Sequence, residues 1–190
     1  INFGFMTTLQ LPQLDTFSGS IKYGYGKDPN YQEWAPGIIN LIEMKLFWNP
    51  SDQLRVNFRL NQQNNKRPEN GSLVSSATVP RLKIEYQLNE SLFLRFVGQY
   101  NSSYRDSLND SSREGNPIYF KNADGSYYRA TKQESNNLQA DFLFSYRPTP
   151  GTLVFVGYGS SLTEPERYRF NSLERQSDGF FIKLSYLYRL

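Results

Sequence analysis

The chain has 190 residues, and its 21 Lys and Arg against 18 Asp and Glu leave a net charge of +3. This balance argues against a nucleic-acid partner, because nucleic-acid-binding domains carry a marked excess of basic residues. The sequence contains no Cys and no His, which removes disulfides, thiolate metal sites and any Ser-His-Asp triad. We therefore expect one domain over residues 1–190, with no enzymatic activity, no metal and no cofactor.

Apolar residues alternate with polar ones along most of the chain, which is the pattern of β-strands with two different faces. No apolar run approaches the roughly 20 residues that a membrane helix needs. The alternation predicts nine antiparallel strands, at residues 1–10, 17–25, 37–48, 54–61, 81–88, 92–100, 138–147, 152–160 and 179–190. The strand at 152–160 is apolar on both faces, so the sequence does not orient it.

The last predicted strand has one wholly apolar face, made of Phe180, Ile182, Leu184, Tyr186, Tyr188 and Leu190. Its length suits a tilted membrane-spanning strand, which needs about 9–11 residues. It resembles the terminal strand of bacterial outer-membrane β-barrels, whose alternating, aromatic-rich end is the signal read by the barrel-assembly machinery. That pattern usually ends in Phe or Trp, so Leu190 departs from it. We interpret these residues as the closing strand and the assembly signal.

The connections between the strands alternate in length. Short ones cover 11–15, 49–52, 89–91 and 148–151, and long ones cover 27–36, 62–78, 101–136 and 161–178. Outer-membrane barrels have short periplasmic turns and longer extracellular loops. Aromatic residues gather near both ends of the strands, as interfacial belts do: Trp48, Tyr86, Tyr146, Tyr186 and Tyr188 near the short turns, and Tyr25, Tyr100 and Tyr158 near the long loops.

These features predict an all-β, antiparallel transmembrane β-barrel in the outer membrane of a Gram-negative-type bacterium. A soluble lipocalin-like barrel remains the alternative, because alternation does not say which face is outside. Single-chain barrels usually have an even number of strands. With nine predicted, we expect residues 1–190 to be the C-terminal part of a longer chain. Residues 179–190 would then pair with strands upstream of Ile1 or with another chain, and not with residues 1–10.

The longest connection contains a candidate hairpin of its own. Asp124-Gly125 lies between the aromatic runs 118–120 and 127–128, and Asp-Gly between two such runs is a strong hairpin signal. We therefore expect short strands that extend beyond the main sheet.

Several segments resemble one bacterial family, in which a family-9 carbohydrate-binding-like domain precedes an outer-membrane barrel domain of unknown function. The matching stretches are 79–87, 94–100, 144–152, 155–160 and 178–188, so the resemblance covers most of residues 79–190. These are strand-and-turn motifs, and they imply the barrel fold rather than a chemistry. The resemblance places the carbohydrate-binding-like part outside this sequence, so it implies no sugar site here.

Basic residues recur on the polar faces of three consecutive predicted strands: Arg55, Arg59, Arg81, Lys83 and Arg95. Rings of Arg and Lys tune pores for anions, so these residues predict a basic lumen patch in a channel or transport-type, porin-like barrel. The alternative is an internal ladder of salt bridges with Glu43, Glu85 and Asp141 that fills a narrow barrel.

The long loops carry two further groups of candidate residues. Acidic residues that could bind Ca²⁺ or bridge lipopolysaccharide, or simply be solvated, are Asp106, Asp110, Glu114, Asp124 and Glu134, and their spacing fits no EF-hand. Aromatic residues that could bind a partner protein or glycan, or serve only the packing of the loops, are Tyr31, Trp34, Tyr119, Tyr127 and Tyr128. The second functional hypothesis is therefore a plugged structural or docking barrel.

Overall fold

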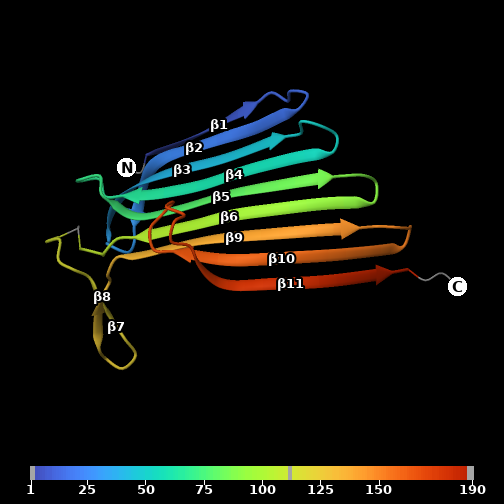
Figure 1. Ribbon diagram of the computed structural model, residues 1–190. Helices are drawn as coiled ribbons and strands as arrows, with labels where there is room; N and C mark the ends of the chain where they lie inside the picture. Colours follow the sequence, from blue (N-terminus) through green and yellow to red (C-terminus); the bar gives the residue numbers. More distant parts are fainter. Residues whose placement is uncertain (1–2, 111–112, 188–190) are drawn as a thin grey trace.

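The computed structural model describes residues 3–110 and 113–187, and over these residues the protein is all-β, without a helix. Nine strands form one antiparallel sheet, and a separate two-stranded hairpin extends from one end of it (Figure 1). In this described part, no helix has the length and apolar character needed to cross a membrane. The strands of the sheet are β1 (Gly4–Leu11), β2 (Phe17–Asn30), β3 (Ala35–Trp48), β4 (Leu54–Lys66), β5 (Leu73–Gln87), β6 (Leu92–Arg105), β9 (Gln133–Tyr146), β10 (Thr152–Glu164) and β11 (Glu174–Tyr186).

All nine predicted strands are present in the predicted order, but most of them are longer than predicted at the end that carries the long loops. β5, for example, begins at Leu73, eight residues before the predicted start at Arg81. The added segments of β4 and β9 are polar on both faces, and that of β5 mixes apolar and polar residues without a period of two, so they show no alternation in the sequence. Backbone pairing nevertheless continues through them, because cross-strand hydrogen bonds do not depend on an apolar face.

The predicted hairpin in the longest connection is confirmed as β7 (Tyr119–Lys121) and β8 (Tyr127–Arg129). Its turn is closed by the backbone N–H of Asn122, which donates to the carbonyl of Ser126 at 2.8 Å. Gly125 has a φ of 87°, a left-handed conformation that Gly adopts without steric cost. The hairpin projects away from the sheet (Figure 1).

The strand registers sort the side chains into two faces, because directly paired residues of neighbouring strands share a face. The apolar face includes Phe58, which pairs with Leu46 and with Leu82. The registers also orient β10, which the sequence left open. Val154 pairs with Tyr146 and Leu184, so Val154, Val156 and Tyr158 belong to the apolar face.

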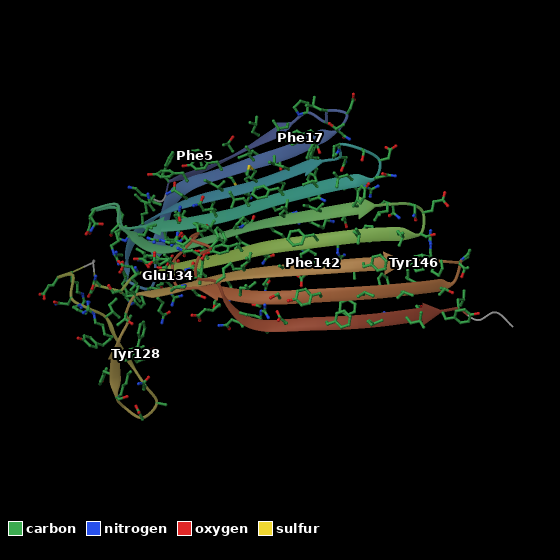
Figure 2. The ribbon with its side chains drawn as sticks, viewed as in Figure 1. Phe5, Phe17, Tyr128, Glu134, Phe142 and Tyr146 are labelled. Atoms are coloured by element: carbon green, nitrogen blue, oxygen red, sulfur yellow. The ribbon has the colours of Figure 1, made fainter. Side chains whose placement is uncertain are left out.

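The sheet is a single layer over most of its length, so its apolar face is uncovered. Phe142 is 52% exposed and Leu184 67% exposed on this face. Figure 2 shows the side chains along the sheet, with Phe142 and Tyr146 labelled in β9. Among the described residues, the buried side chains other than glycine all lie at the long-loop end of the sheet.

The apolar band crosses the sheet diagonally. A row of directly paired residues leads from Leu11, at the turn end of β1, through Gly19, Leu46, Phe58, Leu82, Gly98, Ala140 and Ser160 to Asp178 in β11. The apolar face of β11, however, continues from there to Tyr186, eight residues further towards the turn end. The band thus shifts by about one residue per strand, or roughly 3.3 Å along for each 4.8 Å across. This corresponds to strands tilted by about 35° from the axis of a barrel, within the range of known barrels.

The two edges of the sheet remain open. β1 pairs with β2 only and β11 with β10 only, so residues 3–11 and 174–187 do not pair, as expected from the odd strand number. The described residues therefore form an open sheet and not a closed barrel. With nine antiparallel strands, β1 and β11 run in the same direction. Joining them directly would create one parallel pair, so an antiparallel closure needs an odd number of additional strands.

Candidate functional site: a basic strip on the polar face

The predicted basic patch is brought together by the registers of β3 to β6. Arg59 pairs directly with Arg81 on one side and with Lys45 on the other, so three cations stand side by side in one row. Four residues further towards the short turns, Arg55 pairs with Glu85, and Glu85 pairs with Arg95. Lys83 lies in the row between the Arg59–Arg81 pair and the Arg55–Glu85 pair. We call Lys45, Arg55, Arg59, Arg81, Lys83 and Arg95 the basic strip.

Most of the basic strip has no carboxylate partner. Lys83 Nζ lies 2.9 Å from Glu85 Oε2, and Glu43 Oε1 lies 3.6 Å from Lys22 Nζ, outside the strip. Within the described part of the chain, Arg59 and Arg81 form no ion pair. The same holds for Lys45, Arg55 and Arg95. The predicted ladder of salt bridges is thus formed at Glu85 but does not extend to the arginines.

The row Lys45, Arg59 and Arg81 is electrostatically unfavourable by itself, because like charges placed directly opposite each other destabilise a sheet. Such a row gains from an external anion or from bulk counter-ions. A cavity of about 600 Å³ lies beside it, lined by Arg81, Lys83, Arg95 and Asp141 among others. Chemically, the arrangement can attract anions along one face of the sheet.

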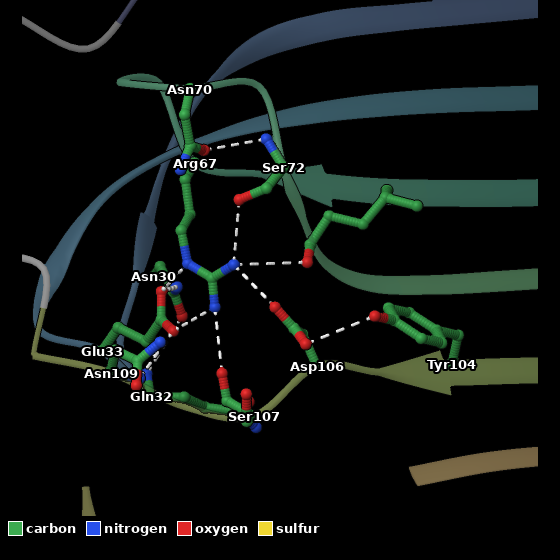
Figure 3. Close-up of polar contacts among 11 residues, drawn as sticks. Asn30, Gln32, Glu33, Arg67, Asn70, Ser72, Tyr104, Asp106, Ser107 and Asn109 are labelled. Carbon is green, nitrogen blue, oxygen red and sulfur yellow. Dashed lines mark hydrogen bonds and ion pairs between the residues drawn. The ribbon is translucent and has the colours of Figure 1, made fainter. Parts of the chain in front are cut away.

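A second polar cluster lies at the long-loop end and was not foreseen from the sequence. Arg67 donates two hydrogen bonds to Glu33, from Nε to Oε2 at 3.0 Å and from Nη2 to Oε1 at 2.6 Å (Figure 3). It also donates to Asp106 at 2.9 Å, to Ser72 at 3.0 Å and to the carbonyl of Ser107 at 3.1 Å. The five N–H groups of a guanidinium are thereby all satisfied. The cluster ties together three loops, those after β2, β4 and β6.

The electrostatics of this cluster favour its charged state. The pKa of Arg67 is raised, chiefly by its hydrogen bond to Glu33, with burial acting against the shift and Asp106 adding to it. Burial by itself would raise the pKa of Asp106. The hydrogen bonds that Asp106 accepts from Arg67 and from the backbone N–H of Ser107 outweigh burial, so this pKa lies below its ordinary value.

The lowered pKa of Asp106 predicts a specific acid sensitivity. A carboxylate whose folded-state pKa is depressed stabilises the folded state above its unfolded pKa of about 3.9, and this contribution disappears as pH falls through the folded pKa. We expect Asp106→Asn to lower the unfolding free energy by about 1 kcal/mol at neutral pH, since the pair is partly solvated. The difference should vanish in strong acid. Urea unfolding of both proteins as a function of pH measures it, and a difference independent of pH would contradict the assignment.

A third cluster fixes the loop between β10 and β11. The Tyr100 hydroxyl donates to Glu164, and the backbone N–H groups of Tyr168 and Phe170 donate to the same carboxylate at 2.9 and 2.8 Å. The rings of Tyr168 and Phe170 pack on Tyr100 with centroids 5.0 and 5.4 Å away. In Figure 1 this loop folds back over the sheet near β6 and β9. Every buried polar atom of the described side chains has a hydrogen-bond partner, so the cluster holds this loop on Tyr100 without an unsatisfied group.

The predicted loop residues do not converge on one site. Tyr31 and Trp34 lie between β2 and β3, whereas Tyr119, Tyr127 and Tyr128 lie on the β7–β8 hairpin, and all five are exposed. The acidic residues are also dispersed: Asp106 pairs with Arg67, and Asp124 accepts hydrogen bonds within the hairpin turn. In the described part of the chain, no three His, Cys, Asp or Glu side chains are placed to hold a metal ion.

The predicted assembly signal is described only in part. Phe180, Ile182, Leu184 and Tyr186 share the apolar face of β11, paired with Tyr158, Val156, Val154 and Thr152 of β10. Tyr188 and Leu190 lie outside the described residues.

The residues that the sequence analysis did not single out are Lys45, Glu33, Arg67 and Glu164. Lys45 was visible only as one polar residue of its strand, because its neighbours depend on register. Glu33 and Arg67 are 34 residues apart, in loops without periodicity, and no local pattern marks such a pair. The chain matches no protein-family model, no curated protein and no solved structure.

Proposed function

We propose that the nine strands are part of a transmembrane β-barrel of the bacterial outer membrane, a channel or transport-type protein whose lumen carries the basic strip. The observation that supports this most is the diagonal apolar band. It is continuous over nine strands, is not covered by a second layer in its middle, and has the shift of about one residue per strand expected for tilted strands in a bilayer.

In this proposal the apolar face contacts lipid and the opposite face lines the lumen. The apolar segment of β6 runs from Leu92 to Tyr100 and that of β9 from Leu138 to Tyr146, nine residues each. A tilted membrane strand needs about 9–11 residues. Extra strands from the same polypeptide or from another chain would close the barrel, and the barrel-assembly machinery and lipopolysaccharide would be its cellular partners. The polar strand extensions and long loops would face the outside.

The unpaired cations make anion preference the expected property of such a lumen. Lys45, Arg59 and Arg81 form the part of the strip with three adjacent positive charges and no carboxylate between them. In a narrow, partly desolvated passage, this row lowers the energy of an anion and raises that of a cation.

The test is electrical recording of the full-length polypeptide in planar bilayers under a KCl gradient. We expect sustained conductance with a reversal potential that indicates anion preference. The triple variant Lys45→Glu, Arg59→Glu and Arg81→Glu should reverse the sign of that potential. A matched control, Lys121→Glu, Arg129→Glu and Lys132→Glu, changes the same number of charges on and beside the outer hairpin and should leave the sign unchanged.

The outcomes separate the candidate functions. Electrical silence of folded protein in the bilayer would overturn the channel proposal and favour the plugged docking barrel. A folded chain that stays monomeric in water without detergent would overturn the membrane proposal and favour the soluble lipocalin-like barrel.

A further inference from the structure

One part of the polar face is formed by glycines. The registers place Gly159 of β10 directly opposite Gly179 of β11, and Gly157 lies two residues from Gly159 on the same face. Glycine inside a strand often marks a position where a ligand approaches the backbone closely. Among the described residues, a Cβ added at Gly179 would meet no atom within 4 Å apart from its chain neighbours. The polar face therefore has a recess where β10 and β11 pair.

Two side chains extend over this recess from its margins. A Cβ added at Gly157 would lie 2.1 Å from the ring of Phe181, so this ring covers Gly157. A Cβ added at Gly159 would lie 2.6 Å from Oδ1 of Asp141, so this carboxylate extends over Gly159. The Phe181 side chain is 53% exposed, so much of its ring is free for contact. The recess thus combines an apolar ring with one carboxylate.

The basic strip borders the recess on the other side. The cavity of about 600 Å³ beside the strip extends from Arg81, Lys83 and Arg95 to the recess, and its volume is typical of small-molecule sites. Lys83 forms an ion pair with Glu85, whereas Arg81 and Arg95 form none over residues 3–110 and 113–187. Three cations against the carboxylate of Asp141 give the described lining an excess of positive charge.

Charged and apolar groups follow each other in one row of this face. Arg95 pairs with Leu143, Leu143 pairs with Gly157, and Gly157 pairs with Phe181. Because neighbouring strands are about 4.8 Å apart, about 14 Å separates the backbones of Arg95 and Phe181. The Phe181 ring covers Gly157 and so shortens this interval by one strand. The lining therefore suits a molecule with an apolar body and an anionic group at one end.

We propose that this cavity binds a small organic anion that carries an apolar ring, such as an aromatic monocarboxylate. The carboxylate would accept two hydrogen bonds from the Arg95 guanidinium, and the ring would pack on Phe181 and Leu143. Asp141 would repel a second negative charge, which favours a monoanion. This inference names a ligand class for the basic strip. It rests on the proposed function in one respect, that the polar face lines the lumen, and it does not require ion conduction.

Fluorine NMR with three probes separates the effect of charge from that of apolar contact. The full-length protein is reconstituted in phosphatidylcholine nanodiscs, and empty nanodiscs give the background of partitioning into lipid. Para-trifluoromethylbenzoate carries the ring and the charge, para-trifluoromethylbenzyl alcohol carries only the ring, and trifluoroacetate carries only the charge. We expect saturable binding of the benzoate and at least tenfold weaker binding of the other two probes.

Two matched arginine variants test the cationic end of the site. Arg95→Gln should weaken binding of the benzoate at least tenfold and leave that of the alcohol unchanged. Arg55→Gln is the control, because Arg55 pairs with the same Glu85 but lies outside the described lining of the cavity. Its affinity for the benzoate should stay within twofold of the original, and an equal loss in both variants would overturn the site.

A second pair of variants tests the recess itself. Gly179→Phe places a ring in the open space and should abolish binding of the benzoate in protein that is folded by circular dichroism. Ser185→Phe adds the same ring to the same face of β11, six residues away and outside the described lining, and should bind the benzoate unchanged. Unchanged binding in folded Gly179→Phe would contradict the proposal.

The remaining outcomes distinguish this site from the channel proposal. Trifluoroacetate bound as tightly as the benzoate would overturn the site, because the strip would then attract anions without the ring. Equally tight binding of the alcohol would reduce the site to apolar partitioning and overturn it as well. Conductance without saturable benzoate binding would overturn the site alone, whereas saturable binding by an electrically silent protein would support the site and overturn only the channel.

Discussion

Replacing Arg67 with Met is expected to destabilise the long-loop end of the protein by about 3–5 kcal/mol, since it leaves a carboxylate buried without its partner. Glu33 has no exposed surface, and two of the six hydrogen bonds that the Arg67 side chain donates go to its carboxylate. The same change removes the ion pair with Asp106 and the contacts with the loop after β4. Three loops therefore lose their common anchor at once.

Amide hydrogen exchange is the most direct measurement, because the cluster controls loops and not the middle of the sheet. The backbone N–H of Asn109 donates to Glu33 Oε1, and that of Gly71 donates to the carbonyl of Arg67. Both amides should lose protection in Arg67→Met, while amides in the middle of β4 and β5 should keep theirs. Equal loss across the whole sheet would show that the cluster supports global stability instead.

A double-mutant cycle separates the cost of the orphaned charge from the value of the pair. Arg67→Met combined with Glu33→Met should cost clearly less than the sum of the single changes, because apolar pairs of similar volume often replace buried ion pairs without loss. Arg169→Met provides the matched control. Arg169 pairs with Glu166 at 2.6 Å, but both side chains are more than 60% exposed, so we expect a loss below about 1 kcal/mol.

The second large effect is expected on the apolar face of β11. Leu184→Arg should destabilise the membrane-inserted protein by about 2–4 kcal/mol, the cost of an Arg facing lipid near the bilayer midplane. Leu184 is 67% exposed and pairs with Val154 on the uncovered face. Tyr186→Arg, nearer the short-turn end, should cost less, since an arginine there can reach the interface. Ser185→Arg, on the polar face, should cost least if the lumen has room.

Equilibrium unfolding in lipid vesicles of two acyl-chain lengths distinguishes this explanation from burial in a soluble core. In a bilayer, the costs of the lipid-facing variants should depend on thickness, and the cost of Tyr186→Arg should rise in the thicker membrane. If the costs of Leu184→Arg and Tyr186→Arg were equal and insensitive to thickness, the lipid-facing assignment of β11 would be wrong.

The nine strands, their order, the two faces of most of them and the hairpin at Asp124-Gly125 were determined by the sequence alone. These features are local: period-two alternation specifies a two-faced strand, and turn residues specify where it reverses. The basic side chains Arg55, Arg59 and Arg81 could be assigned to the polar face for the same reason. The lengths of the strands could not, because the added segments of β4 and β9 are polar on both faces and residues 73–80 of β5 mix apolar and polar side chains without alternation.

Only the tertiary structure decided which residues meet. The row of Lys45, Arg59 and Arg81 depends on register, which is set by the pairing of three strands and not by any one of them. The apolar faces of β10 became distinguishable only through its pairing with β9 and β11. Glu33 reaches Arg67 across 34 residues, and Tyr100 reaches Glu164 across 64, because the loops fold over the end of the sheet. Such contacts form between segments with no shared periodicity, so their physical cause lies in the folded geometry and leaves no pattern in the chain.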